Sequence, residues 1–343
     1  MARAIAIIMV TLNHNFRSNN TEFVHDLFVV FGKAGVPLFL LITGYLNCHK
    51  TLYDYYKDKK WTRCLDILIA YILLGSICHW GLCYYRGNSF SMQIYFHDLL
   101  SFQLTKNGWF VEMWIGLFFI TPFLNMIVAN CAKMGKKCFL CTIITVVCMT
   151  SIPAFVNRDG MTLMPGYWTK VWPIALYLVG AWLRHYQLRF NNMSLLFVCF
   201  VIIIGEPLLN YIIKPGKFMY FWGGHDDIIY MALAISVFLL CMKSPLNIGT
   251  NLIVRKLASL SLYIYLIGYL FDTLMNDWFV KCHDFKNPIK YIPYNAIAFL
   301  CSITLSFLTA LIYHFIYKNI ISLVSRYNSI LCDKRNENLP TGS

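Results

Sequence analysis

The chain has 343 residues, of which 58% are apolar and only 13% are charged, whereas soluble domains average roughly 45–50% apolar and about 25% charged residues. Together with a mean hydropathy of +0.57, this composition excludes an ordinary soluble domain, a disordered chain and a disulfide-stapled secreted module. The formal charge of +13 would suggest nucleic acid in a soluble protein. Here the basic residues lie between apolar runs, so we expect the protein to contact membrane lipid and not nucleic acid.

Ten continuous apolar runs follow one another along the chain, and a membrane-spanning helix needs about 20 such residues. Because these runs do not alternate between polar and apolar positions, they favour helices over a membrane β-barrel. The sequence thus predicts an all-α integral membrane protein, a bundle of about ten transmembrane helices. The runs cover about residues 2–16, 27–47, 64–84, 109–129, 138–156, 168–184, 193–213, 227–242, 257–279 and 291–317.

The lysine and arginine residues predict how the bundle is oriented. If the N-terminus lies inside, 18 of the 29 Lys and Arg residues fall on the cytoplasmic side, as the positive-inside rule requires. We therefore expect both termini in the cytoplasm, one membrane domain over residues 1–318, and a cytoplasmic tail over residues 319–343.

The first run carries two chemically distinctive side chains, Arg3 and His14. Eleven steps of about 100° end about 20° past three full turns, so both side chains share one helix face, and the rise between them is about 16.5 Å. We expect Arg3 near the cytoplasmic surface, where a guanidinium suits phosphate binding. His14 would lie deeper, where a neutral imidazole suits proton transfer. A snorkelling arginine and a hydrogen-bonded structural histidine are the alternative.

Glu206 lies in the middle of the run 193–213. A carboxylate at this depth should face the bundle interior or a wet cavity. Pro207 should kink the helix, and Asn210, four residues after Glu206, shares its face. Glu206 could bind the acceptor or orient an imidazole, or it could be a paired structural residue at the kink. The consecutive residues of the segment 222–227 have no distant ligating partner, so we expect a solvated loop there and no metal site.

Five segments, in order between residues 3 and 268, resemble the type 3 membrane acyltransferases. The first is Arg3 followed by ten residues and His14, the spacing found in that family. The second, Gly35-Val-Pro-Leu-Phe-Leu-Leu-Ile-Thr-Gly-Tyr45, resembles the family's Val-Pro-Leu-Phe-Phe-x-x-Ser-Gly-Tyr pattern. The others are Lys59-Lys60-Trp61-Thr62-Arg63, Trp109-Phe110 with Gly116-Leu-Phe-Phe-Ile-Thr-Pro122, and Ser259-Leu-Ser-Leu-Tyr-Ile-Tyr-Leu-Ile-Gly268.

Three positions depart from the family pattern, and at one of them Ala70 replaces a frequent proline before Tyr71. Gly268 stands where the family often has a histidine, and Asn107 stands near the place where a histidine often precedes the tryptophan. Arg3 and His14 are intact. On this resemblance the core chemistry is therefore preserved, while the acceptor and the activity itself remain open.

The resemblance implies transfer of an acyl group, usually acetyl from acetyl-CoA, to a hydroxyl of an extracytoplasmic glycan or lipid-linked sugar. It implies that Arg3, Lys60 and Arg63 hold the phosphates of CoA, and that His14 acts as general base or as a transient acyl carrier. We expect the acceptor substrate near Glu206, and at Trp109 and Glu112 near the start of the fourth predicted helix. In a bacterial host the protein would lie in the inner membrane. The alternative is a polysaccharide or lipid-linked sugar exporter or flippase component without acyl chemistry.

Overall fold

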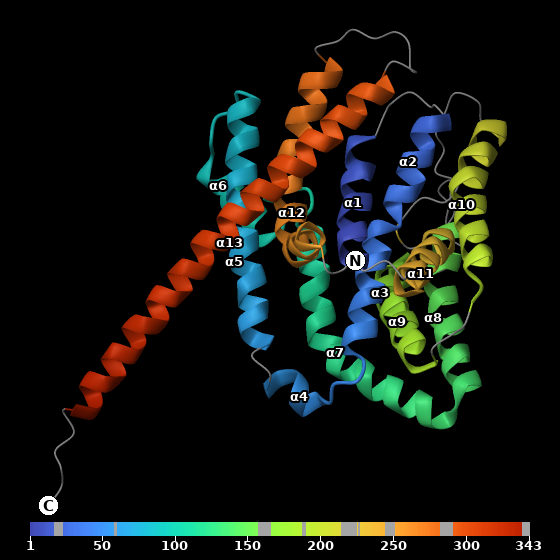
Figure 1. Ribbon diagram of the computed structural model, residues 1–343, viewed down its shortest axis with the longest axis horizontal. Coiled ribbons are helices and arrows are strands. Elements are labelled where there is room, and N and C mark those ends of the chain that lie inside the picture. The colour runs from blue at the N-terminus through green and yellow to red at the C-terminus, as the bar shows by residue number, and fades with distance from the viewer. Residues whose placement is uncertain are drawn as a thin grey trace, which may run out of the picture.

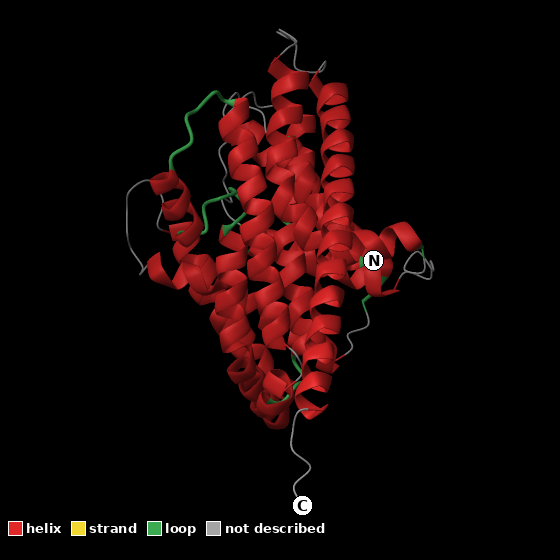
Figure 2. Cartoon of the chain, turned by 90° about the vertical axis from the view of Figure 1, so that its left-hand side faces the viewer, coloured by secondary structure: helices red, strands yellow, loops and turns green. Residues whose placement is uncertain are grey.

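The computed structural model describes residues 1–16, 23–57, 60–156, 166–186, 190–213, 225, 227–243, 251–281 and 291–337. Within these ranges the chain is helical with short connections and contains no strand, as Figure 2 shows. The expectation of an all-α fold is confirmed.

The first half of the chain forms α1 (Ala2–Asn15), α2 (Phe23–Lys33), α3 (Gly35–Asn47), α4 (Leu52–Lys57), α5 (Lys60–Tyr85), α6 (Met92–Leu100), α7 (Trp109–Met134) and α8 (Lys136–Val156). The second half forms the 3₁₀-helix η1 (Gly166–Val171), α9 (Trp172–Tyr186), α10 (Asn192–Ile213), α11 (Ile228–Lys243), α12 (Leu252–Asn276), the π-helical turn η3 (Asp277–Lys281) and α13 (Tyr291–Glu337).

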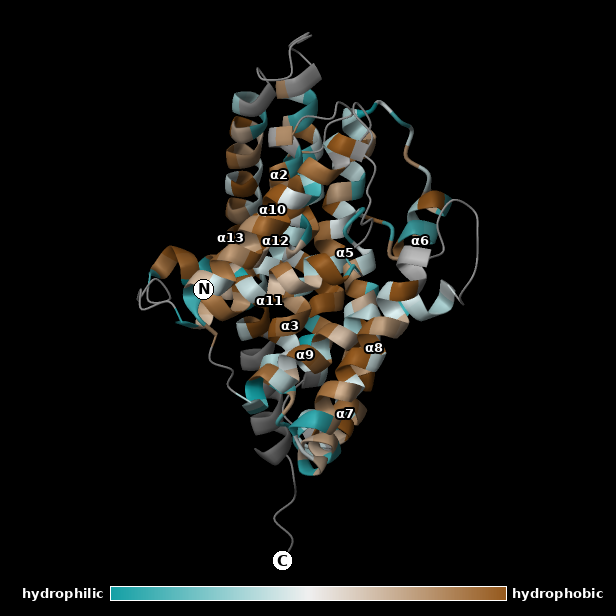
Figure 3. Ribbon diagram, turned by 90° about the vertical axis from the view of Figure 1, so that its right-hand side faces the viewer, coloured by the Kyte–Doolittle hydropathy of each residue, from teal (hydrophilic) through white to brown (hydrophobic). Residues whose placement is uncertain are grey.

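Six helical stretches of the described chain are long and apolar enough to cross a membrane. Large apolar side chains are also exposed on several of these helices, and the ribbon coloured by hydropathy in Figure 3 shows hydrophobic residues along much of the bundle. Because water does not stabilise such a surface, the chain is an integral membrane protein. The six stretches are Asp26–Asn47, Trp61–Tyr85, Trp109–Met134, Asn192–Leu209, Leu252–Phe279 and Pro293–Leu323.

The predicted run 27–47 is divided into two helices at Ala34. Pro37 lies in the first turn of α3 and has no N–H to donate to the carbonyl of Lys33, four residues before it. That carbonyl instead accepts a hydrogen bond from the ring Nδ1 of His225, at 3.1 Å. The proline therefore frees a backbone acceptor, which binds a side chain from a distant part of the sequence.

Helices α3 and α9 cross in backbone contact at two glycines. A Cβ atom at Gly44 would lie 2.0 Å from the carbonyl oxygen of Tyr177, and one at Gly180 would lie 2.1 Å from that of Leu41. In membrane bundles, small residues of this kind let helices approach closely and gain van der Waals contact. The crossing is further held by Asn125 of α7, whose side chain donates to the carbonyls of Asn47 and Lys50 and accepts from the Tyr177 hydroxyl.

The two ends of the bundle carry different short elements (Figure 1). We call the lower end in Figure 1, with α4 and the turn between α7 and α8, the α4 end. The opposite end, in whose direction α6 lies, is the α6 end. The N-terminus lies at mid-height in all three whole-chain views. Helix α1 spans only 14 residues, about 21 Å, and Arg3 is exposed near its start, so the expectation that Arg3 lies near the cytoplasmic surface stays a prediction.

Substitution of Gly44 by alanine should lower the free energy of unfolding by about 1–3 kcal/mol, because the added methyl overlaps the backbone of α9. The matched control is Gly205→Ala, since no atom lies within 4 Å of a Cβ built at Gly205. Apparent melting temperatures of the purified proteins in detergent would measure both. If Gly44→Ala has the same apparent melting temperature as Gly205→Ala, the close contact of α3 and α9 at Gly44 is contradicted.

Candidate functional site

His14 is placed by the packing of α1 against two neighbouring elements. On one side α1 approaches Gly32 of α2 so closely that a Cβ there would lie 2.6 Å from the Cβ of Asn13 and 2.7 Å from the carbonyl oxygen of Met9. On another side α1 packs along α12, where the Asn276 side chain donates to the backbone carbonyl of His14 at 3.4 Å. The imidazole is therefore carried by a helix turn that is held from both sides.

A buried carboxylate ties the end of α1 to α12 and α13. Asp272, which is 5% exposed, accepts a hydrogen bond at 2.7 Å from the side-chain amide of Asn15, the residue after His14. The same carboxylate oxygen accepts from the hydroxyl of Ser302 in α13. A buried carboxylate needs such donors, so this three-helix junction fixes the register of α1 and the position of His14.

His14 lines a cavity of about 250 Å³. Its walls come from α1, α2, α3, α12, the segment before α7 and the residue His225. No carboxylate is among the residues that line it, although Lys106 is. The half-buried imidazole therefore faces a small space that is large enough for reacting groups. The lining residues are Val10, Asn13, His14, Gly32, Val36, Lys106, Asn107, Trp109, His225 and Tyr265.

A second cavity, of about 410 Å³, lies further along α1 and is lined by Arg3 and Arg63. Its walls are largely apolar and aromatic, and none of its lining residues is acidic. Val36 and Tyr265 line this cavity and also that of His14, so the two cavities adjoin. The arrangement provides two guanidinium groups in one cavity and an imidazole in the next.

Trp109, the first residue of α7, is the side chain on which four cavities meet. Besides the His14 cavity, it lines spaces of about 530, 580 and 290 Å³. Glu112, one turn further along α7, is exposed and lines the first two of these. The predicted pair Trp109 and Glu112 therefore shares two cavities, and Trp109 connects them to His14.

His225 belongs to the site although the sequence predicted only a solvated loop for its segment. Its ring stacks on Trp109, with 5.8 Å between ring centroids, and on Trp172, at 6.2 Å. Its Nδ1 must be the donor to Lys33, because a carbonyl only accepts. The one sequence signal for this contact is Pro37, which leaves the Lys33 carbonyl without a helical donor.

The structure does not bring Glu206 to the His14 cavity. Glu206 is 3% exposed, accepts a hydrogen bond at 2.5 Å from the Tyr230 hydroxyl, and lines none of the cavities above. The Tyr230 hydroxyl in turn accepts from Lys33 at 3.1 Å. Lys60 begins α5, but its side chain lies outside the described part of the chain, as does that of Asn210.

Two of the positions that depart from the family pattern lie on either side of this region. Asn107 lines the His14 cavity, and its amide donates to the carbonyl of Tyr265 at 2.7 Å. Gly268 is buried, and a Cβ built there would lie 3.8 Å from the Ser306 hydroxyl and 3.9 Å from the Asp272 carboxylate. Asn107 therefore touches the cavity directly, whereas Gly268 adjoins the buried junction behind α1.

A family model described as an acyltransferase domain matches residues 1–311. The chain belongs to the acyltransferase 3 family. The resemblance inferred from five short segments is confirmed, and membership supports an acyltransferase in a membrane. Comparison with curated proteins and with solved structures gave no match.

Replacement of Asp272 by leucine should destabilise the protein by about 1–3 kcal/mol for each of the donors of Asn15 and Ser302 that it leaves unsatisfied. Asp272→Asn retains an oxygen acceptor, so its free energy of unfolding should fall by less. Thermal unfolding in detergent measures the difference between the two variants. If both melt at the same temperature, the carboxylate does not act through these hydrogen bonds.

Proposed function

We propose that the protein transfers an acyl group, with acetyl as the first candidate, from acyl-CoA to a hydroxyl group of an extracytoplasmic or lipid-linked glycan. The observation that carries this proposal is the pair of adjoining cavities along α1. One holds Arg3 and Arg63 without a carboxylate, and the other holds His14. Family membership supports acyl transfer, and this pair of cavities favours a donor site followed by a reaction site.

The proposed donor site is the cavity that Arg3 and Arg63 line. Guanidinium groups bind phosphate in bidentate geometry and remain charged. Neither arginine forms an ion pair with a carboxylate within the described residues, so both are available to the phosphates of CoA. The aromatic walls suit the pantetheine arm, whose thioester would extend past Val36 and Tyr265 into the His14 cavity.

In this proposal the α4 end faces the cytoplasm, and the bundle has about ten spans with both termini inside. The cluster Lys133, Lys136 and Lys137 at the turn between α7 and α8 supports this orientation. In a bacterium the membrane would be the inner one. The acyl donor then enters from the cytoplasmic side and the glycan from the α6 end.

His14 is the proposed general base. Its imidazole takes the proton of the acceptor hydroxyl while that oxygen forms a bond to the thioester carbonyl carbon. The tetrahedral intermediate then collapses as its carbon–sulfur bond breaks, and the leaving thiolate takes the proton from the imidazolium. Trp109 and the exposed Glu112 would position the acceptor, since both residues line cavities that meet the His14 cavity at Trp109.

The test is acetyl-CoA binding by calorimetry and acetyl transfer by the purified protein in detergent. His14→Ala should retain binding but lose transfer by about 10²–10⁴-fold. Arg3→Ala should weaken binding by about 10- to 100-fold, because charge-assisted hydrogen bonds to phosphate are lost. Lys60→Ala and Arg63→Ala test the remaining proposed phosphate ligands in the same assay.

Two exposed residues outside the cavities serve as controls, Arg184→Ala for the arginines and His185→Ala for His14. Both control proteins should bind and transfer like the unmodified protein. Transfer that survives His14→Ala would exclude the base assignment. A folded protein that binds no acetyl-CoA would favour the alternative, an exporter component without acyl chemistry.

A further inference from the structure

One cavity next to the His14 site has a charge pattern that the proposed reaction does not explain. This cavity of about 530 Å³ lies between the end of α5, α6, the segment 101–108 and the start of α7, and its volume is within the range of small-molecule sites. Lys106 and Trp109 line both this cavity and that of His14. A ligand held here therefore lies beside the proposed reaction site.

Lys106 is presented to the two cavities by a firmly held backbone. The residues on either side of it, Thr105 and Asn107, are both 2% exposed. Their side chains donate to consecutive carbonyls of α12, Thr105 to Leu266 at 3.2 Å and Asn107 to Tyr265 at 2.7 Å. Because its neighbours are fixed inward, Lys106 projects outward and is exposed.

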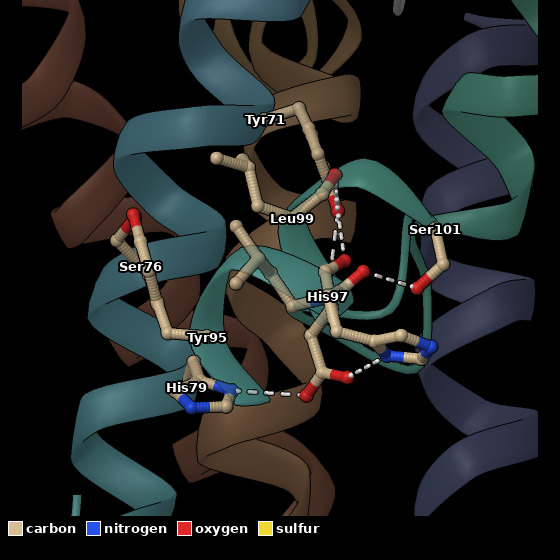
Figure 4. A network of polar contacts seen from close by, with 9 residues as sticks. Tyr71, Ser76, His79, Tyr95, His97, Leu99 and Ser101 are labelled. Carbon is tan, nitrogen blue, oxygen red and sulfur yellow. Dashed lines mark hydrogen bonds and ion pairs between the residues drawn. The ribbon is translucent and has the colours of Figure 1, made fainter. Parts of the chain in front are cut away.

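A buried tyrosine fixes the same segment to α6. The hydroxyl of Tyr71 donates to the carbonyls of Asp98 and Leu99, at 3.2 and 3.3 Å, and accepts from the backbone N–H of Leu104 at 3.4 Å. Figure 4 shows this hydroxyl beside the end of α6. The wall of the cavity is therefore a connected structure and not a set of independent surface side chains.

The acidic residue nearest to α5 in this wall is already engaged by two imidazoles. Asp98 lies 3.6 Å from Nδ1 of His79 and 3.2 Å from Nδ1 of His97 (Figure 4). It forms no ion pair with Arg86 or Lys106, the two cations that line the cavity. Both cations therefore remain without a carboxylate partner within the residues that the structure describes.

The opposite side of the cavity is suited to a sugar ring. Trp109 offers an aromatic face, and the exposed carboxylate of Glu112 can accept hydrogen bonds from hydroxyl groups. A neutral sugar would satisfy this side only. An anionic substituent would also give Arg86 and Lys106 charge-assisted partners, which are roughly twice as strong as neutral ones.

We propose that this cavity is the acceptor subsite and that it selects a sugar bearing an anionic group, a carboxylate or a phosphate, with Arg86 and Lys106 as its ligands. This inference rests on the proposed function for the role of the bound sugar. Because Lys106 lines both cavities, the anion is held at their boundary, and a hydroxyl of the same sugar is directed toward His14. Arg86 and Lys106 are thus specificity residues and not catalytic ones.

The experiment measures saccharide binding to the full-length protein in nanodiscs by calorimetry, at low ionic strength and without acyl-CoA. The probes are cellobiouronic acid against cellobiose, and glucose 1-phosphate against methyl glucoside. We expect one acidic probe to bind at least about tenfold more tightly than its neutral counterpart. The pair that shows this preference identifies the anion as carboxylate or phosphate.

Variants then assign the preference to the cavity. Arg86→Gln and Lys106→Gln should each reduce the affinity for the acidic probe about tenfold and leave the neutral probe unchanged. Glu112→Gln should weaken acidic and neutral probes alike. Lys133→Gln, which removes the same charge from an exposed position on α7 that does not line this cavity, should change neither.

Equal binding of acidic and neutral probes, no binding of any probe by a protein that still binds acetyl-CoA, or a preference unchanged in both variants would overturn the subsite. Since no donor is present, this result is independent of acyl transfer. A charge preference in a protein that cannot transfer acetyl would preserve the subsite and exclude the proposed function. Acetyl transfer to neutral glycans, without any preference for an acidic sugar, would preserve the proposed function and exclude the subsite.

Discussion

The position of His14 depends on one buried carboxylate. Asp272 of α12 accepts hydrogen bonds from Asn15 in α1 and Ser302 in α13, and so joins the first helix of the chain to two helices near its other end. Because buried polar groups need hydrogen-bond partners, this junction favours the register of α1 in which Asn15 reaches the carboxylate. The register of α1 sets the position of the imidazole, and so it also sets the shape of the cavity that His14 lines.

Close packing on the other side of α1 completes this constraint. The approach of α1 to Gly32 leaves no room for a side chain between the helices. The break between α2 and α3 has a related effect, since Pro37 frees the Lys33 carbonyl that then holds His225. A proline in one helix thus positions a ring at the mouth of the site, between Trp109 and Trp172.

The cavities along α1 are lined by positively charged side chains that have no carboxylate partner within the described part of the chain. Arg3 and Arg63 line the proposed donor cavity without a carboxylate, and Lys106 is the charged residue shared by the His14 cavity and the neighbouring cavity of about 530 Å³. Away from them, Lys33, Tyr230 and Glu206 form a hydrogen-bonded chain that links a lysine to a carboxylate through the tyrosine hydroxyl. Lys33 and Glu206 are thus linked through a hydroxyl group, whereas Arg3, Arg63 and Lys106 have no carboxylate partner among the described residues.

The sequence by itself determined the all-α membrane class, the approximate positions of the long helices and the family, because long apolar runs and locally spaced motifs are properties of neighbouring residues. It also placed Arg3 and His14 on one face of α1, since helical periodicity is local. Only the tertiary structure decided that α1 begins at mid-height, that Glu206 pairs with Tyr230, and that Lys106 and His225 join the His14 cavity. These facts depend on contacts between helices distant in sequence, and such contacts have no periodic signal along the chain.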